Sequence, residues 1–325
     1  MKKLLMAKGA KSIVETNLGV KIGEQVAIIT EPKQMAIAES LASAVYAAGA
    51  EPTIHILMPR ERDGQEPPKA IAAAMEKSDA FISAVYTSIT HTNAVKNACK
   101  SGSRGIMLTQ FSEKQMIEGG VFADYHEASK NCKKVAELMA NSEYISITTP
   151  SGTNLVVSAK GRRGNALTGL VGPGEFGPVP TVEANVSPLE GSANGIIVAD
   201  ASIPYIGIGL LKTPVKVEVK DGFIIPESIS GGEEAKKLAA DWISKNDPNV
   251  YNIAEVGVGL NPMCKFTGSM LEDEGVFGSL HIGVGTSITL GGTIKAACHY
   301  DLIMTKPTLI ADGITILKDG QLMIS

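Results

Sequence analysis

The chain has 325 residues, of which 44% are hydrophobic and 20% charged, and its net charge at pH 7 is −4. The composition is that of a globular protein, and the length exceeds what one hydrophobic core usually serves, so two domains are expected. Non-specific nucleic-acid binding needs a basic surface, which this acidic balance does not favour, so no nucleic-acid partner is expected.

Apolar segments and cysteines indicate the compartment. No apolar run reaches the roughly 20 residues that span a bilayer, and residues 4–7 are too short for a signal-peptide core. We therefore expect a cytoplasmic protein with no membrane partner. The four cysteines are scattered without a C-x-x-C pair, which favours free thiols in a reducing compartment; they are Cys99, Cys132, Cys264 and Cys298.

Residues 1–141 alternate strand-like and helix-like segments. Strands are predicted at 24–30, 52–58, 80–85 and 105–109, and helices at 34–50, 67–78, 93–102 and 124–142. This alternation predicts an α/β domain with a parallel sheet covered on both faces. The first strand is followed by ITEPKQMA, which has no glycine, so a dinucleotide site is disfavoured. A scaffold and substrate-capping role is expected.

Residues 142–325 follow a different pattern, typical of a β-rich α+β domain. A hairpin is predicted at 143–161, further strands at 195–203, 215–225, 279–286 and 313–324, and one helix at 231–245. Two Lys-Asp-Gly turns, at 220–222 and 318–320, mark hairpins.

Histidines and carboxylates in this second domain form a candidate site. His299 and Asp301 are two positions apart in a strand-like segment, so their side chains point to one side. His281 lies in another strand-like run, Glu183 in a glycine- and proline-rich loop, and Glu255 in an otherwise apolar stretch. Two imidazoles and several carboxylates form the ligand set of a divalent metal site, and bridging carboxylates could hold two cations.

Each of these residues also has an ordinary structural interpretation. His299 and Asp301 could form a plain hydrogen bond, Glu255 a buried ion pair and Glu183 part of a solvated loop, while His281 could be a core histidine. The acidic run 272–274 precedes His281 and supplies a further candidate.

Five motifs in order resemble the thermophilic-type metallo-aminopeptidases (aminopeptidase T and leucyl aminopeptidase, peptidase family M29), across nearly the whole chain. They are LGVKIGEQVAIIT with LASAVYAAGAEPTIHIL, GPGEFGPVPTVEANVSPLEGSANGIIVAD, IAEVGVGLNP, EDEGVFGSLHIGVG and HYD. The resemblance implies a β-rich C-terminal metal-binding domain and a homodimer with a closed internal cavity formed with the N-terminal domains. It also implies metal-ligand roles for five residues, Glu183, Glu255, His281, His299 and Asp301.

The chain departs from that family at two places, and one is the Glu183 segment, which reads Val-Glu-Ala-Asn rather than Glu-Glu-Val-Phe. The family peptidases carry a tyrosine shortly after the first motif histidine, where this chain has Ser287, Ile288 and Thr289. The segment Cys298–Asp301 is also similar to the 2,5-dihydroxypyridine 5,6-dioxygenases of the same superfamily. That resemblance implies one Fe(II) held by His281, His299 and Asp301, whereas a glutamate at position 255 favours the aminopeptidase-like arrangement.

Three functions follow as hypotheses. The first is a metal-dependent hydrolase, most simply an aminopeptidase, with one or two Zn, Co or Mn ions and with Glu183 or Glu274 as general base; Glu183 would then not be a ligand. The second is an Fe(II) ring-cleaving dioxygenase. The third is a non-catalytic metal-binding dimer. The expected substrate is a peptide or another small molecule.

Overall fold

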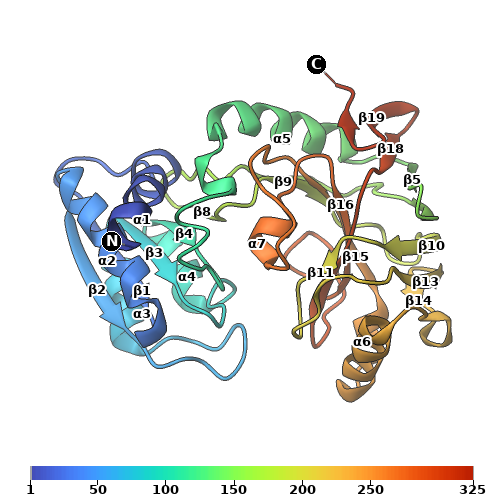
Figure 1. Ribbon diagram of the computed structural model, residues 1–325, viewed down its shortest axis with the longest axis horizontal. Helices are drawn as coiled ribbons and strands as arrows, with labels where there is room; N and C mark the ends of the chain where they lie inside the picture. Colours follow the sequence, from blue (N-terminus) through green and yellow to red (C-terminus); the bar gives the residue numbers. More distant parts are fainter. Residues whose placement is uncertain (1, 325) are drawn as a thin grey trace. The chain divides into compact units, whose positions relative to one another are not determined.

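The computed structural model describes residues 2–324 and divides the chain into two compact units (Figure 1). The first unit ends at Ser129 but also includes Leu167–Thr181. The second unit comprises Lys130–Ala166 and everything from Val182 onward. The sequence pattern placed one boundary at residue 141, whereas in the structure helix α5 (Tyr125–Met139) contains the first division point and a later segment returns to the first unit.

The first unit alternates helices and strands as predicted. Its elements are α1 (Lys2–Lys11), a π-helix (Ser12–Asn17), β1 (Gln25–Thr30), a 3₁₀ turn (Pro32–Gln34), α2 (Met35–Ala47), β2 (Glu51–Ile56), α3 (Lys69–Lys77), β3 (Ala80–Ala84), α4 (Asn93–Lys100), β4 (Arg104–Met107), a 3₁₀ turn (Gly120–Phe122) and β8 (Phe176–Pro178).

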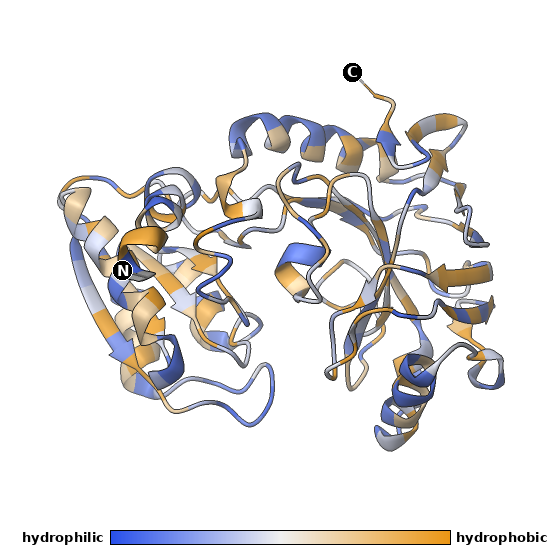
Figure 2. Ribbon diagram, in the orientation of Figure 1, coloured by the Kyte–Doolittle hydropathy of each residue, from blue (hydrophilic) through white to orange (hydrophobic). Residues whose placement is uncertain are grey.

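The five strands form one parallel sheet in the order β2-β1-β3-β4-β8. One sheet face, with Ile29 and Phe81, packs on Met75 of α3 and Val95 of α4 in a fully buried cluster. Helix α2 packs against β1 and β2. The inner strands β1 and β3 are mostly apolar (Figure 2) and buried from Val26 to Thr30 and from Ala80 to Ala84, because both of their faces are covered. The predicted parallel α/β architecture is confirmed.

The second unit is mostly β. Its strands are β5 (Ile145–Thr148), β6 (Asn154–Val157), β7 (Gly164–Leu167), β9 (Glu183–Val186), β10 (Asn194–Ala199), β11 (Ser202–Ile203), β12 (Gly209–Leu210), β13 (Val215–Lys220), β14 (Phe223–Ile224), β15 (Ile253–Gly259), β16 (Leu280–Gly285), β17 (His299–Met304), β18 (Thr308–Ala311), β19 (Ile314–Lys318) and β20 (Gln321–Leu322). Its helices are the part of α5 from Lys130 onward, α6 (Glu233–Ser244) and α7 (Met270–Asp273), and it has 3₁₀ turns at Pro226–Ser228 and Pro248–Tyr251.

These strands form two sheets. An eight-stranded sheet has the order β14-β13-β10-β6-β5-β18-β19-β20, and a seven-stranded sheet has the order β12-β11-β17-β16-β15-β9-β7. Both predicted Lys-Asp-Gly turns join hairpin partners, β13 with β14 and β19 with β20. The predicted β-rich class of this part is confirmed.

Helix α6 shows why the sequence predicted it correctly. Ala235, Leu238 and Trp242 recur at helical spacing and are buried, while most charged residues of the helix lie outside this stripe (Figure 2). Among the described residues, no helix has both the length and the apolar character that crossing a membrane requires.

Candidate metal centre

Four neighbouring strands of the seven-stranded sheet carry the candidate ligands. Glu183 lies on β9, Glu255 on β15, His281 on β16, and His299 and Asp301 on β17. Figure 1 shows β9, β15 and β16 side by side. The alternation and register of these antiparallel strands place all five side chains on one sheet face.

The opposite face of these strands is apolar. Val256 and Val258 of β15, Ile282 of β16 and Leu302 of β17 are fully buried there. This hydrophobic packing fixes the register, because a shift by one residue would turn the carboxylates into the core.

Glycines make room for the site. In the strand register Glu183 lies opposite Gly259, His281 opposite Gly257, and Glu255 and Asp301 both opposite Gly283. A Cβ atom at Gly257 would lie 1.9 Å from His281 Nε2, and one at Gly283 would lie 2.6 Å from His299 Nε2. The imidazoles therefore occupy space that a side chain on the facing strand would fill.

The ligand atoms gather into two sets that share Glu255. In each set the candidate atoms lie within 4.8 Å of one another: Glu183, Glu255 and His281 form one, and Glu255, His299 and Asp301 form the other. Glu255 Oε2 lies 2.9 Å from His299 Nε2, and Glu255 Oε1 lies 3.9 Å from His281 Nε2. The two oxygens of one carboxylate thus face the two histidines.

Two carboxylates of the site each have one oxygen without a hydrogen bond. Glu183 Oε1 accepts a hydrogen bond from Asn185, but the buried Oε2 has no hydrogen-bond partner and lies 3.5 Å from His281 Nε2. Asp301 Oδ2 accepts from Tyr205, but the buried Oδ1 has no hydrogen-bond partner and lies 3.4 Å from His299 Nε2. Buried oxygens of this kind are suited to bind a cation.

His299 is oriented for coordination. Its Nδ1 lies 2.8 Å from the Thr286 carbonyl oxygen, and because a carbonyl only accepts, Nδ1 carries the proton and donates. The Nε2 lone pair of a neutral ring would then point toward Glu255 and Asp301. A backbone carbonyl on the far ring nitrogen is a usual feature of metal-binding histidines.

The pKa values of the three carboxylates in the two sets differ. Burial raises the pKa of Glu183 to about 7. The charge of His281 acts to lower this pKa, and the charge of Glu255 acts to raise it. Burial also acts to raise the pKa of Glu255, but the interactions of its carboxylate with His281 and His299 outweigh burial and lower that pKa. Burial acts to raise the pKa of Asp301 too, but the charge of His299 outweighs burial and holds that pKa below its usual range.

The two histidines show the opposite shift. Burial acts to lower the pKa of His281, but Glu183, Glu255 and Asp301 together raise it to about 9. Asp301 and Glu255 likewise raise the pKa of His299 well above its usual value in spite of burial. Without a cation, protonated histidines neutralise the carboxylates. A divalent cation would take over that role once the rings release their protons.

Tyr205 and Glu274 border the second set. The Tyr205 hydroxyl lies 2.5 Å from Asp301 Oδ2 and 3.0 Å from Glu274 Oε1. Burial and the charges of Asp301 and Glu274 raise the pKa of Tyr205 well above its usual value, so it remains a phenol. Burial, with the charges of Asp301 and Glu183, also raises the pKa of Glu274 well above its usual value. Glu274 therefore favours its protonated form.

The residues present fit a divalent metal centre. Rigid strands bring together two imidazoles and three buried carboxylates. Two of these carboxylates have an oxygen without a hydrogen bond, and hard or borderline cations take such ligands. These groups could hold one or two divalent ions. Such a centre can polarise a carbonyl, acidify a water or react with dioxygen, depending on the metal.

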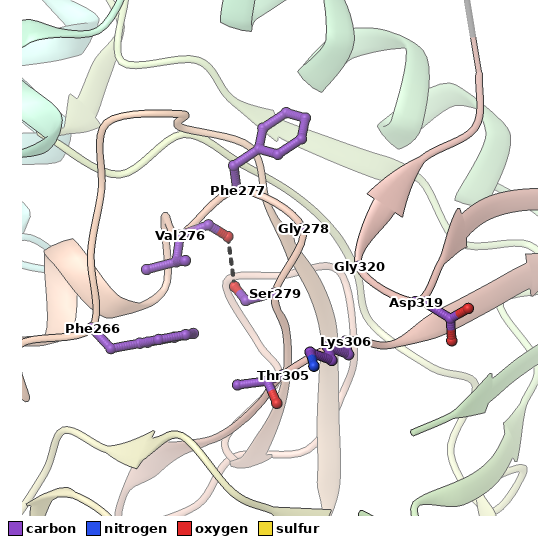
Figure 3. A pocket seen from close by; sticks show the side chains of 9 residues that line it. All are labelled: Phe266, Val276, Phe277, Gly278, Ser279, Thr305, Lys306, Asp319 and Gly320. Atoms are coloured by element: carbon purple, nitrogen blue, oxygen red, sulfur yellow. Dashed lines mark hydrogen bonds between the residues drawn. The ribbon is translucent and has the colours of Figure 1, made fainter. Parts of the chain in front are cut away.

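A separate pocket of about 210 Å³ also lies in the second unit (Figure 3). Its lining includes Phe266, Phe277, Lys306 and Asp319, and none of the candidate ligands is part of it. In Figure 3 the Ser279 hydroxyl donates to the Val276 carbonyl beside it. The candidate metal centre is therefore a crowded sheet face and not this pocket.

The structure brings together all six residues that the sequence singled out. One expectation about their setting was wrong: Glu183 is not in a loop but on β9, where it is 4% exposed. Its segment forms a strand because it pairs with β15, a long-range partner that the local sequence does not reveal. The plain salt bridge to Lys or Arg considered for Glu255 is replaced by two histidine contacts.

Sequence reasoning missed Tyr205 and Asn185. Tyr205 lies in the connection between β11 and β12, and no motif marks it. The spacing of the strand glycines was a usable signal that was also missed. In EVGVG (255–259) and HIGVG (281–285), glycines follow the candidate ligand at the second and fourth positions, which keeps one face open.

The family of the protein follows from a family-model match. The model described as 2,5-dihydroxypyridine 5,6-dioxygenase (NicX) matches residues 14–324. The chain belongs to this dioxygenase family. A curated 2,5-dihydroxypyridine 5,6-dioxygenase from Pseudomonas putida KT2440 is 27% identical over 163 residues. That alignment covers 46% of this chain and 45% of the relative, less than half of either.

Solved structures share the fold of this member of the dioxygenase family. The 2,5-dihydroxypyridine dioxygenase of P. putida KT2440 superposes with a TM-score of 0.83 at 18% identity, over 99% of this chain and 98% of that one. Wild-type AmpT from Thermus thermophilus superposes with a TM-score of 0.70 at 15% identity, over the full length of both chains. Both superpositions show that the chain has the fold of these two proteins.

Replacing Gly257 with alanine tests whether the glycine maintains the site. The new Cβ would overlap the His281 ring, so the strand or the ring must move, at about 1–3 kcal/mol of stability. We expect a lower unfolding midpoint and much reduced uptake of Co²⁺, measured by equilibrium dialysis. Gly177→Ala is the control, because its Cβ meets only the Val171 side chain, at 3.3 Å. Normal uptake in Gly257→Ala would contradict this role.

The stability of the metal-free protein should fall as pH rises from 5 to 9. Glu183 and His281 have folded-state pKa values of about 7 and 9, above their ordinary 4.5 and 6.5, so the folded state binds more protons across this range. The stabilisation from His281 is complete below pH 6.5 and is lost as pH rises through 9. Thermal unfolding in a chelator at several pH values measures this trend.

Deprotonation of Glu183 and His281 should have the opposite effect on the stabilisation that added metal gives. Because a cation needs deprotonated ligands, the gain in unfolding midpoint on adding Co²⁺ should grow with pH. A metal-free midpoint that rises between pH 6.5 and 9, or a metal increment that shrinks there, would contradict the assigned shifts.

Proposed function

We propose that this protein is a metal-dependent ring-cleaving dioxygenase that acts on a hydroxylated aromatic or pyridine ring. The observation that carries this proposal is the dioxygenase family match across residues 14–324. A dioxygenase of this type opens a ring carbon–carbon bond and places both atoms of O₂ in the product. The dioxygen is thus the oxidant, and no other electron donor is needed.

In this proposal the set of Glu255, His299 and Asp301 holds iron(II), with His281 on the other side of Glu255. Iron(II) would supply the one-electron steps that allow O₂ to react with a closed-shell ring. The chain supplies the orientation: the Thr286 carbonyl holds the His299 ring, and Tyr205 holds Asp301. Glu274, whose raised pKa favours its protonated form, is the proposed proton carrier beside Asp301.

Oxygen uptake tests this reaction. Protein loaded with iron(II) under nitrogen should consume one O₂ per ring opened when mixed with 2,5-dihydroxypyridine or a catechol, as the ring absorbance disappears. His299→Ala should lower both iron content and rate, the rate by about 100-fold, because it removes a ligand. His126→Ala is the control, since that histidine lies outside both sets. Iron-loaded protein without O₂ uptake over a panel of such rings would reject the dioxygenase.

A second candidate function, a metal-dependent hydrolase of the aminopeptidase type, is favoured by the shared position of Glu255. One carboxylate between two ligand sets is the arrangement of a two-cation site. The set around His299 also contains two carboxylates and one imidazole, rather than the two imidazoles and one carboxylate usual for iron oxygenases.

The chain offers the groups that such a hydrolysis needs. Two cations would acidify a water and polarise the scissile carbonyl. Glu274 in its ionised form, or Glu183, would accept the proton of the water and pass it to the departing amine; the pKa of Glu183 is raised to about 7 and that of Glu274 well above its usual value. In the first case Glu183 is a ligand, and in the second it is the general base.

Cation stoichiometry and amide cleavage test this candidate. The hydrolase requires two Zn²⁺, Co²⁺ or Mn²⁺ ions per chain and turnover of aminoacyl amides or short peptides. Glu255→Gln should reduce binding of both ions, because both sets use its carboxylate. Glu218→Gln is the control, as Glu218 is an outward-facing strand glutamate. A single bound ion with no cleavage of any amide would remove this candidate.

We also propose the oligomeric state, the location and the role of the first domain. The homodimer, the cytoplasmic location and a substrate-capping role for the first 141 residues come from the sequence and its family resemblance. The molar mass in solution tests the first of these directly.

A further inference from the structure

Two of the candidate ligands, Asp301 and Glu183, are held in place by neighbouring hydrogen-bond donors. Asp301 has one oxygen engaged and one free: Tyr205 donates to Oδ2 at 2.5 Å, while the buried Oδ1 makes no hydrogen bond and faces His299. The same division appears at Glu183, where Asn185 donates to Oε1 at 2.8 Å, while Oε2 makes no hydrogen bond and faces His281. An outer donor thus selects which oxygen points into each ligand set.

We propose that Tyr205 is a positioning residue for the metal centre, which holds Asp301 so that only Oδ1 is presented to a cation. This inference rests on the proposed metal centre but not on which reaction it performs. A donor that occupies one carboxylate oxygen favours binding through the other oxygen alone. Positions around the cation then stay open for substrate.

Tyr205 is well fixed for this role. Its ring stacks on that of Tyr300 with a centroid distance of 5.0 Å and an interplanar angle of 30°. Its own N–H donates to the Ile203 carbonyl at 2.8 Å, and its carbonyl accepts from the N–H of Ile208 at 2.9 Å. Both hydrogen bonds fix the turn between β11 and β12, and β11 itself pairs with β17, the strand that carries Asp301.

The backbone beside Tyr205 is strained. Ile206 has a φ of 48°, a left-handed conformation that costs free energy for a β-branched residue. Strain of this kind persists only where surrounding contacts impose it. Here the imposed conformation places the phenol against Asp301 and Glu274.

The sequence showed no tyrosine in the segment that follows His281, where the aminopeptidases have one. The structure brings a phenol to these ligands from a different connection, about 75 residues earlier in the chain. Because its hydroxyl is engaged by Asp301, this phenol acts through a ligand rather than as a free group.

Tyr205→Phe tests the inference, with Tyr300→Phe as the matched control. Both variants lose one hydroxyl from the same ring stack, but the Tyr300 hydroxyl donates to Asp241 of α6, whereas the Tyr205 hydroxyl donates to Asp301. Co²⁺ affinity is measured by competition with a chelator of known affinity. We expect about 10–100-fold weaker binding for Tyr205→Phe and a change of less than about 3-fold for Tyr300→Phe.

The visible spectrum of bound Co²⁺ gives a second readout that a loss of packing would not produce. Band intensity reports coordination number and geometry, so freeing Asp301 Oδ2 should alter the spectrum in Tyr205→Phe but leave it unchanged in Tyr300→Phe. Unfolding midpoints of the metal-free proteins show whether both variants are folded.

Each outcome decides the question. Unchanged affinity and spectrum in Tyr205→Phe reject the positioning role, and so does an equal loss in Tyr300→Phe, which would assign the effect to the ring stack. A Tyr205→Phe protein that fails to fold would show that Tyr205 serves the fold, which also overturns the inference. Wild-type protein that binds no Co²⁺ would instead reject the metal centre itself. Lack of turnover with normal Co²⁺ binding would count only against the proposed reactions.

Discussion

The concentration of negative charge on one face of a sheet is the constraint on which the rest of the site depends. Glu183, Glu255 and Asp301 are each no more than 4% exposed, and their like charges repel strongly when buried together. Such a group of carboxylates is stable only with protons or cations between them. Both histidines face these carboxylates, and their raised pKa values show that protons fill the role when no cation does.

The fold meets this constraint with rigid strands and small facing residues. The candidate side chains point away from an apolar face that fixes the register, and strand glycines opposite them leave space for two imidazole rings. Asn185 and Tyr205 donate hydrogen bonds to Glu183 and Asp301, and His299 Nδ1 donates one to the Thr286 carbonyl, so the direction of these three groups is set. Preorganisation of this kind reduces the rearrangement that binding a cation would require.

The family match and the geometry of the ligand sets point to different reactions. The family match names a dioxygenase, while Glu255, shared by two ligand sets, resembles the bridging carboxylate of a two-cation hydrolase. Both reactions would use the same five residues on the same strands. The two reactions differ in the number of bound cations and in whether O₂ or water reacts with the substrate. The fold alone determines neither of these two features.

The sequence by itself determined the α/β and β-rich halves, because periodicity and turn residues are local signals, as in α6 and the Lys-Asp-Gly hairpins. It also determined five candidate ligands and Glu274 as chemically unusual residues in the β-rich half. Only the tertiary structure decided that Glu183 lies on a strand, that residues 167–181 join the first unit, and that Tyr205 contacts Asp301. These features depend on strand pairing and side-chain contacts between distant segments, and the local residue pattern does not encode which distant segment will be the partner.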